Sequence, residues 1–165
     1  MNLKKITALS DINTLSHLAK VIWCECYSKI LSSDQIEYMT GKFLSPTAIT
    51  EQLQNDGYEY YFIECDNSVA GFTAFRMEEN SLFLSKLYVK KEYRQRGIAS
   101  SVIKCLEERC RQDKLSCIWL TVNVNNHTAI NAYKQKGFVI FKDECTDIGN
   151  GYYMDDHFMK KHISS

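Results

Sequence analysis

The sequence predicts one α/β domain built on a mixed sheet with helices on both faces, and three observations lead to this expectation. The chain has 165 residues, a length that suits one domain with one hydrophobic core. Helical and strand-like segments follow each other in the order helix, helix, strands, helix, strand, helix, strands. No repeat, low-complexity tract or linker interrupts them. We therefore expect residues 1–165 to form a single domain.

The first part of the chain has a helical pattern. Apolar side chains recur at helical spacing through Ile12, Leu15, Leu18, Ala19, Ile22 and Cys26. Ser32 followed by Gln35 is a capping box that opens a second helix. The single proline, Pro46, follows Ser45, and this pair indicates a further helix start with serine as the N-cap.

From residue 58 onward the pattern changes to strands. An aromatic segment at 60–63, turn residues at 66–68 and a second strand at 69–75 predict a hairpin. Segment 82–89 is apolar at nearly every position, which is typical of a strand covered on both faces.

The remaining elements alternate between helix and strand. A helix with an apolar face follows, carrying Ala99, Val102, Ile103, Leu106 and Cys110. Residues 117–124 form another buried strand, and a short helix at 129–135 ends at Gly137. Segments 138–141 and 152–159 predict a closing hairpin with its turn at 149–151.

Charge and cysteine usage exclude several classes of partner. Twenty basic residues balance twenty acidic ones, so no global field favours nucleic acid or an anionic membrane. No run of about 18 apolar residues is present, so we expect no membrane span. The cysteine count is odd, at seven, and the N-terminus lacks the apolar region of a secretory signal. We therefore expect a cytoplasmic protein with reduced thiols, in which Cys105 and Cys110 are buried on a helix.

Cys24 and Cys26 have the spacing of a metal-binding pair. A zinc site needs two such pairs, or a cysteine pair and a histidine pair at fixed spacing, and the sequence supplies no second pair. On a helix these two side chains point to different faces. We therefore expect no metal site.

The most informative segment lies between a buried strand and a helix, at Arg94-Gln95-Arg96-Gly97-Ile98-Ala99-Ser100. The first turn of a helix has N–H groups without intrahelical partners, and its dipole favours an anion. Gly97 permits close approach to the backbone or a positive φ. The small residues after it keep that approach clear, and two arginines add charge. The segment predicts a cradle for a phosphorylated ligand, with an ordinary surface turn as the alternative.

Two other phosphate-binding motifs are excluded by spacing. The chain contains no GxxxxGK[ST], so it has no P-loop, and no GxGxxG, so it has no dinucleotide fingerprint. A hydrolase of the GxSxG type is also not indicated, because that motif is missing and the four histidines are scattered.

Two motifs in this region resemble those of a known family. Arg94, Gly97 and Ala99 match a cofactor loop of the form Arg/Gln-x-x-Gly-x-Gly/Ala, and the strand end Leu87-Tyr88-Val89 precedes it. The segment from Asn126 to Phe138 matches Asn-x-x-Ala-x-x-x-Tyr-x-x-x-Gly-Phe. In order and spacing, both motifs resemble those of the GCN5-related N-acetyltransferase (GNAT) family. The resemblance is strong from about residue 58 to residue 138.

The resemblance implies a fold and a reaction. The fold is a mixed, mostly antiparallel central sheet flanked by helices on both faces. The reaction transfers an acetyl group from acetyl-CoA to an amine. The strands ending at Val89 and near Val124 would splay apart, which would leave backbone groups of Leu87 and Val89 available to pantetheine.

The resemblance also implies roles for individual residues. The loop would hold the pyrophosphate through the segment Arg94, Gln95, Arg96, Gly97, Ile98, Ala99 and Ser100. Asn126 would bond along the pantetheine arm, and Tyr133 would sit by the thioester sulfur. Lys136 would reach the 3′-phosphate.

The chemistry needs an acid and a base. Tyr133 fits the acid, because a nearby phenol can protonate the departing CoA thiolate; a buried structural aromatic is the alternative. The base is not visible, since Leu84-Ser85-Lys86 stands where many relatives place a glutamate. Glu25, Glu78 and Glu79 are candidates, and a backbone- or water-mediated route is equally open.

The acceptor side has two interpretations. Trp23, Tyr27, Tyr38 and Phe43 form either an aromatic wall or core. Asp147, Asp155 and Asp156 form either an acidic patch suited to a polyamine or a solvated edge strand, and strand alternation lets only one of Asp155 and Asp156 face a site. The layout of the first sixty residues loosely resembles that of polyamine-acetylating members. We therefore expect a small-molecule amine as acceptor. A peptide amine, a non-catalytic acyl-CoA sensor and a homodimeric assembly stay open.

Overall fold

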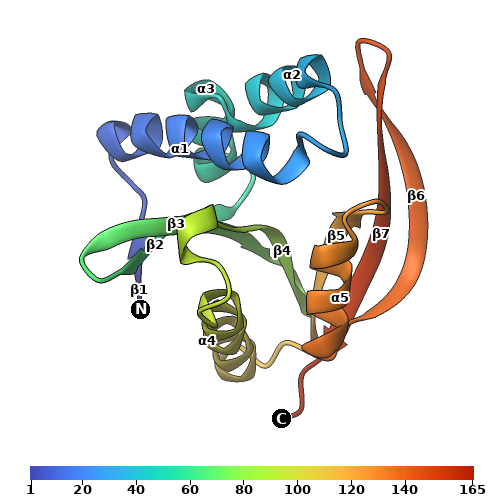
Figure 1. Cartoon of the computed structure of the whole chain (residues 1–165). Helices are drawn as coiled ribbons and strands as arrows, with labels where there is room; N and C mark the ends of the chain where they lie inside the picture. Colours follow the sequence, from blue (N-terminus) through green and yellow to red (C-terminus); the bar gives the residue numbers. More distant parts are fainter. The chain divides into compact units, whose positions relative to one another are not determined.

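The computed structural model describes residues 1–165. The N-terminal elements are β1 (Asn2–Lys5), α1 (Leu9–Tyr27), α2 (Ser33–Leu44), α3 (Pro46–Gln54), β2 (Tyr58–Cys65) and β3 (Ser68–Met77). They are followed by β4 (Ser81–Val89), the 3-10 turn η1 (Lys91–Tyr93), α4 (Ile98–Gln112), β5 (Cys117–Asn123), α5 (His127–Gln135), β6 (Val139–Gly149) and β7 (Tyr152–His162). Figure 1 shows these elements in chain order. No helix is long and apolar enough to cross a bilayer.

The strands form a seven-stranded sheet in the order β1-β2-β3-β4-β5-β7-β6. Strands β4 and β5 are parallel, whereas the β1–β2, β2–β3, β5–β7 and β6–β7 pairs are antiparallel. This confirms the expected mixed, mostly antiparallel sheet flanked by helices. The chain divides into two compact units, residues 1–76 with 86–102 and residues 77–85 with 103–165. Strand β4 and helix α4 each contribute to both units.

In the first unit, helices α1, α2 and α3 lie together over one side of β2 and β3 (Figure 1). The predicted caps are confirmed: Gln35 N donates to Ser32 Oγ at 3.1 Å, and Ala48 N donates to Ser45 Oγ at 3.2 Å. The core consists of large apolar side chains from these helices and strands, among them Leu15, Ile22, Ile49, Tyr60 and Phe72. The amphipathic first helix is therefore confirmed, with its apolar side in this core.

Strands β3 and β4 approach closely at Gly71. A Cβ atom on this residue would lie 2.1 Å from the carbonyl oxygen of Tyr88, much nearer than any side chain tolerates. Lys90 N donates to Ala70 O at 2.8 Å beside this contact. Glycine is therefore required at position 71 so that the two backbones can meet just before the end of β4.

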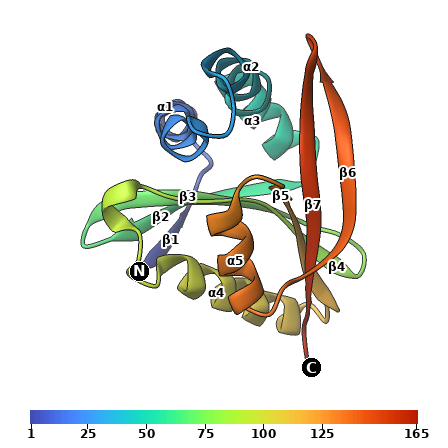
Figure 2. The same cartoon turned by 45° about the vertical axis from the view of Figure 1, so that its right-hand side comes forward.

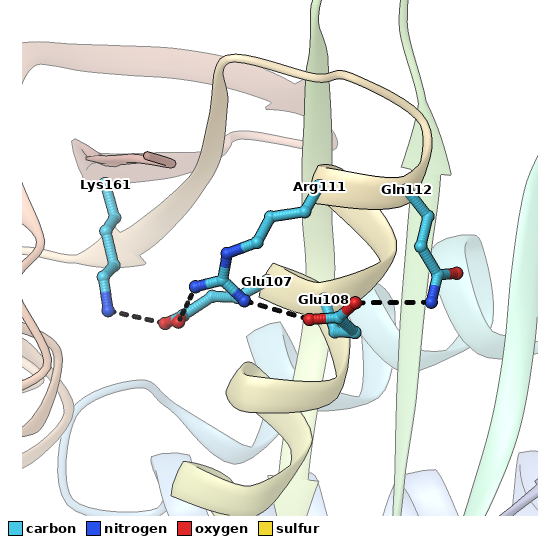
Figure 3. Close-up of polar contacts among 5 residues, drawn as sticks. All are labelled: Glu107, Glu108, Arg111, Gln112 and Lys161. Carbon is cyan, nitrogen blue, oxygen red and sulfur yellow. Dashed lines mark hydrogen bonds and ion pairs between the residues drawn. The ribbon is translucent and has the colours of Figure 1, made fainter. Parts of the chain in front are cut away.

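In the second unit, β5 alternates between buried and half-exposed side chains. Ile118, Leu120 and Val122 are buried, and the residues between them are half-exposed. A polar network joins α4 to β7 in this unit (Figure 3): Lys161 Nζ donates to Glu107 Oε1 at 2.5 Å, and Arg111 lies 3.6 Å from the same carboxylate. Lys161 pairs with Ile118 across the β5–β7 ladder. Helix α4 therefore covers the Ile118 face of these strands.

Several expectations about elements need correction. Strand β1 was not predicted, because it is four residues long and its pattern of side chains carries no strand signal. The closing hairpin is longer than expected, since β6 is exposed from Val139 to Asp147 and so has no alternation to read. Strand β4 is not covered on both faces along its length, because only Leu82 and Leu84 are buried. Cys105 is exposed, whereas Cys110 is buried as expected.

Candidate functional site

The loop between β4 and α4 has the backbone that an anion cradle requires. Gln95 and Gly97 adopt φ values of 62° and 74°. Ser101 N donates to Gly97 O at 3.0 Å, which closes the first turn of α4. The N–H groups of residues 98–100 precede that bond and so have no partner inside the helix. No atom lies within 4 Å of the Cβ position on Gly97, so a phosphate can reach these donors.

Arg94 faces the protein rather than the open side of this loop. Its Nε donates to Val89 O at 2.9 Å. One of its terminal nitrogens lies 3.5 Å from Glu25 Oε2 and 3.3 Å from Cys26 Sγ. Arg94 thus ties the loop to the end of β4 and to α1, and its charge is already balanced by Glu25. The expectation that Arg94 and Arg96 add positive charge at this loop stays a prediction.

Glu25 holds the same segment at a second point. Its Oε2 accepts a hydrogen bond from the backbone N–H of Lys91 at 3.4 Å. Burial raises the pKa of the Cys26 thiol beside it, and the positive charge of Arg94 opposes that rise. The sequence indicated Glu25 as a candidate base, whereas in the structure it holds Lys91 and Arg94 in the connection between β4 and α4. The signal missed in the sequence is that a carboxylate near the end of α1 needs a cation, and Arg94 supplies one.

The end of β4 directs alternate backbone groups to β3. Thr73 Oγ1 donates to Lys86 O at 2.8 Å, and Lys90 N donates to Ala70 O. Because neighbouring residues of a strand point their backbone groups to opposite edges, those of Leu87 and Val89 point away from β3. The carbonyl of Val89 already accepts one hydrogen bond, from Arg94, so the availability of the Leu87 and Val89 backbone to pantetheine stays a prediction. The parallel ladder of β4 with β5 ends at Phe83 and Trp119.

The second motif lies on α5 in the second unit. Asn126 is the N-cap, and its Oδ1 accepts from Ala129 N at 3.3 Å. Tyr133 is half-exposed and packs edge-on against Phe138, with 5.5 Å between ring centroids. Lys136 follows the last turn and donates to Ala132 O at 3.3 Å. The motif therefore places a capping amide and a half-exposed tyrosine on one short helix.

Comparison with known proteins decides which family has this arrangement. Residues 20–138 match the model of the acetyltransferase (GNAT) family, a span that includes both motifs. The chain belongs to the GNAT family. It is an acetyl-CoA-dependent N-acetyltransferase, and acetyl-CoA is its co-substrate.

Relatives of this GNAT chain differ in their acceptors. Spermidine N(1)-acetyltransferase of Thermoplasma acidophilum is 24% identical over 155 residues, covering 92% of this chain and 94% of the relative. A putative [ribosomal protein bS18]-alanine N-acetyltransferase of Bacillus subtilis is 26% identical over 106 residues, covering 64% and 67%. The crystal structure of PaiA N-acetyltransferase from Thermoplasma acidophilum in complex with coenzyme A has a TM-score of 0.78 at 22% identity, covering 98% and 99%. This likeness confirms the fold.

The acidic residues of this acetyltransferase lie in different environments. Asp156 is only 8% exposed, and burial, with a smaller contribution from Asp155, raises its pKa to about 6. Asp155 is exposed. Asp147 accepts from Gly149 N at 2.8 Å, which fixes the turn of the β6–β7 hairpin. As strand alternation required, only one of the two adjacent aspartates is buried, and it is Asp156.

The aromatic residues of α1 belong to the core of the first unit. Trp23 and Tyr27 pack against Tyr88 with ring centroids 5.8 and 6.3 Å away, and the phenols of Tyr27 and Tyr88 hydrogen-bond at 2.9 Å. Trp23 is 6% exposed, and its indole N–H is buried without a hydrogen-bond partner. Tyr38 is instead 5.7 Å from the ammonium of Lys42. Of the two interpretations left open, the structure therefore favours core for Trp23 and Tyr27.

Among the carboxylates proposed as bases in the GNAT reaction, Glu78 already accepts hydrogen bonds from two side chains. It accepts from Trp119 Nε1 at 3.0 Å and from Ser81 Oγ at 2.8 Å, at the turn that precedes β4. The adjacent Glu79 lies at the same turn and is exposed.

Lys86 lies near the middle of β4. Lys86 as a whole residue is half-buried, but its amine is surrounded by protein. This burial lowers the pKa of the amine to about 8. The ammonium lies 5.8 Å from the centroid of the Tyr60 ring. The absence of a glutamate here was evident from the sequence, but the buried amine of Lys86 was not predicted. A lysine within an otherwise apolar strand was the signal that could have indicated it.

Proposed function

We propose that this acetyltransferase acetylates a small amine that carries at least one further positive charge, such as a polyamine. Acetyl-CoA would be held by N–H groups of residues 94–100, by backbone groups of Leu87 and Val89, and by Asn126. Lys136 would contact the 3′-phosphate. These assignments rest on the two family motifs and on the open backbone at Gly97. We expect residues 1–165 to act as one catalytic domain, because β4 and α4 run through both units.

The reaction is a direct attack of the neutral amine on the thioester carbonyl. A new N–C bond forms, the C–S bond breaks, and the thiolate of CoA takes a proton from the phenol of Tyr133, while the proton that the newly acetylated nitrogen loses returns to the Tyr133 phenolate through water. An acceptor amine with a pKa near 10.4 must first lose a proton, which costs about 4.6 kcal/mol at pH 7. The half-exposed position of Tyr133 on α5 supports its role as the acid.

The buried carboxylate of Asp156 is the observation that carries the choice of acceptor. At pH 7 it is mostly ionised, since its pKa is about 6, and a buried anion needs a cation nearby. The second ammonium of a diamine would supply that charge. Exposed ion pairs contribute only about 0–1 kcal/mol, so a buried carboxylate is the better anchor. A relative named for acetylating spermidine supports the same class of acceptor.

A peptide or protein amine is the second candidate. A relative named for the alanine of ribosomal protein bS18 favours it. The seven free cysteines support a cytoplasmic location, where both kinds of acceptor are available. A non-catalytic acyl-CoA sensor would bind acetyl-CoA without releasing CoA for any amine.

The test compares CoA thiol release with spermidine or a diamine against a monoamine of equal length. We expect kcat/KM for the diamine to be at least tenfold higher, which corresponds to about 1.4 kcal/mol of transition-state binding. In Asp156→Asn the ratio should fall toward one. Asp155→Asn is the matched control, because the adjacent carboxylate is exposed, and its ratio should stay at the wild-type value. A wild-type ratio near one, or activity on peptide amines alone, would contradict the proposal.

A further inference from the structure

The end of helix α5 is a tight turn that leads into β6, and Figure 2 shows β6 running on beside β7. Phe138 N donates to Tyr133 O at 3.0 Å, and Gly137 N donates to Lys134 O at 3.0 Å. Gly137 has a φ of 93°, a value that favours glycine, and Phe138 after it is 1% exposed. Because Tyr133 lies on the last turn of α5, its position depends on how firmly this α5–β6 turn is held.

The side chain of Lys161 on β7 lies against the α5–β6 turn. A Cβ atom on Gly137 would be 3.4 Å from Cε and 3.7 Å from Cδ of Lys161, so the stem of the lysine passes beside the Cα of the glycine. In the β6–β7 ladder, Val139 pairs with Lys160. The strand that carries Lys161 is therefore the one on which the turn rests.

Glu107 of α4 holds the ammonium at the end of that stem (Figure 3). Lys161 Nζ donates to Glu107 Oε1 at 2.5 Å, and Arg111 lies 3.6 Å from the same carboxylate. The side chains of Glu107 and Lys161 are 13% and 26% exposed. Water screens such a pair less than it screens an exposed one, and a charged hydrogen bond also fixes the geometry of its partners. Glu107 thus keeps Lys161 in place beside Gly137.

The other end of α5 has separate anchors. Asn126 N donates to Asn123 O at the end of β5, at 2.9 Å. The side chain of Asn126 caps the helix by accepting from Ala129 N. Loss of the Lys161 contact should therefore shift the end of α5 that carries Tyr133 and leave the end that carries Asn126 in place.

We propose that the Glu107–Lys161 pair positions Tyr133 for acetyl transfer, by holding the α5–β6 turn through the contact of Lys161 with Gly137. This inference rests on the proposed role of Tyr133 as the acid. Glu107 and Lys161 act through Tyr133, so they are positioning residues. A displacement of about 1 Å at a reacting group can cost about 10²-fold in rate, so a small movement of the turn is enough to lower kcat.

The first experiment measures kcat and the KM for acetyl-CoA in Lys161→Met and Glu107→Gln, with the amine that wild type acetylates fastest. Methionine keeps an unbranched stem without the ammonium, and glutamine removes the negative charge. Each variant should lower kcat at least tenfold and keep the KM for acetyl-CoA within a few-fold of wild type. Glu108→Gln is the matched control, because this neighbouring carboxylate of α4 pairs with Arg111 and not with Lys161. It should keep the wild-type kcat, and circular dichroism checks that each variant is folded.

A second experiment separates this inference from the role of Tyr133 itself. Lys161→Met is also made in a Tyr133→Phe chain, which has no phenol left to position. There it should lower kcat by less than about twofold, because two changes that act through one group are not additive.

The outcomes distinguish the two proposals. If Tyr133→Phe alone leaves kcat unchanged, the acid role is wrong and this inference is wrong with it. If Tyr133→Phe lowers kcat while Lys161→Met and Glu107→Gln do not, the acid role stands and the positioning role is overturned. An equal loss from Lys161→Met in both chains would also overturn it, since the pair would then act on something other than Tyr133.

Discussion

At the scale of single residues, Gly97 decides how closely a phosphate can approach α4. Its φ of 74° is rarely adopted by residues with a side chain, and nothing occupies the space beside its Cα. We predict that Gly97→Val raises the Kd for CoA at least tenfold, or about 1.4 kcal/mol, because a branched side chain would both strain the loop and fill that space. Isothermal titration calorimetry on the folded variant measures this.

Gly151→Val is the control for the Gly97 prediction. Gly151 also has a positive φ, of 78°, with nothing within 4 Å of its Cβ position. It lies at the turn between β6 and β7. Both substitutions therefore introduce similar backbone strain, and only the one in the cofactor loop should weaken CoA binding. Equal Kd values for the two variants would remove Gly97 from the binding site.

Tyr133 is the residue whose chemical role is easiest to isolate. Phenylalanine preserves the edge-on contact with Phe138 and removes only the hydroxyl. We predict that Tyr133→Phe lowers kcat by about 10²- to 10⁴-fold, the usual loss when a general acid is removed. The KM for acetyl-CoA should change by no more than a few-fold. If kcat is unchanged while chemistry is rate-limiting, Tyr133 is a structural residue.

At the scale of elements, the pairing of β3 with β4 depends on Gly71. An alanine there would bring its Cβ to 2.1 Å from Tyr88 O, so the strands would have to separate. We predict that Gly71→Ala lowers the free energy of unfolding by about 1–3 kcal/mol, as overpacking usually does. Urea denaturation followed by circular dichroism measures the change.

Gly41→Ala is the control for the Gly71 prediction and should change the stability in the opposite direction. Gly41 lies within α2, where no atom is within 4 Å of the Cβ position. The alanine should stabilise the chain by about 0.5–1 kcal/mol, because glycine loses more conformational freedom in a helix. If Gly71→Ala is as harmless as Gly41→Ala, the close approach of β3 and β4 is not a constraint on the fold.

At the scale of the whole molecule, the stability of the fold should depend on pH through Asp156. Burial raises the pKa of this carboxyl from 3.8 to about 6, so between these values the folded chain keeps a proton that the unfolded chain has lost. Stability must then fall as the pH rises through this window. The full effect is on the order of 3 kcal/mol at 1.36 kcal/mol per pKa unit.

Asp156→Asn isolates this contribution. Since asparagine carries no charge at any pH, the variant should match wild type at pH 4 and be more stable at pH 7.5. The measurement is the difference in unfolding free energy between the two proteins as a function of pH. A difference that does not change between pH 4 and 7.5 would mean that the Asp156 carboxylate is not desolvated in the folded chain.

Much of the fold could be predicted from local patterns. The caps at Ser32 and Ser45 were readable because a serine side chain satisfies backbone donors only two or three residues ahead. The β4–loop–α4 segment was readable because a strand, a glycine and a helix start are consecutive in sequence. Strand β1 and the part of β6 beyond residue 141 were not, because backbone pairing holds them in the sheet and their side chains show no alternation.

The same distinction, between features set by neighbouring residues and features set by distant segments, applies to the candidate site. By itself the sequence determined the loop around Gly97, the α5 motif and the family they imply, because each depends on residues within a few positions of one another. Only the tertiary structure decided that Arg94 pairs with Glu25, that Trp23 is core, and that Asp156 rather than Asp155 is buried. Charge pairing and desolvation depend on which distant segments meet. That information exists only once α1, β4 and β7 are folded against their neighbours.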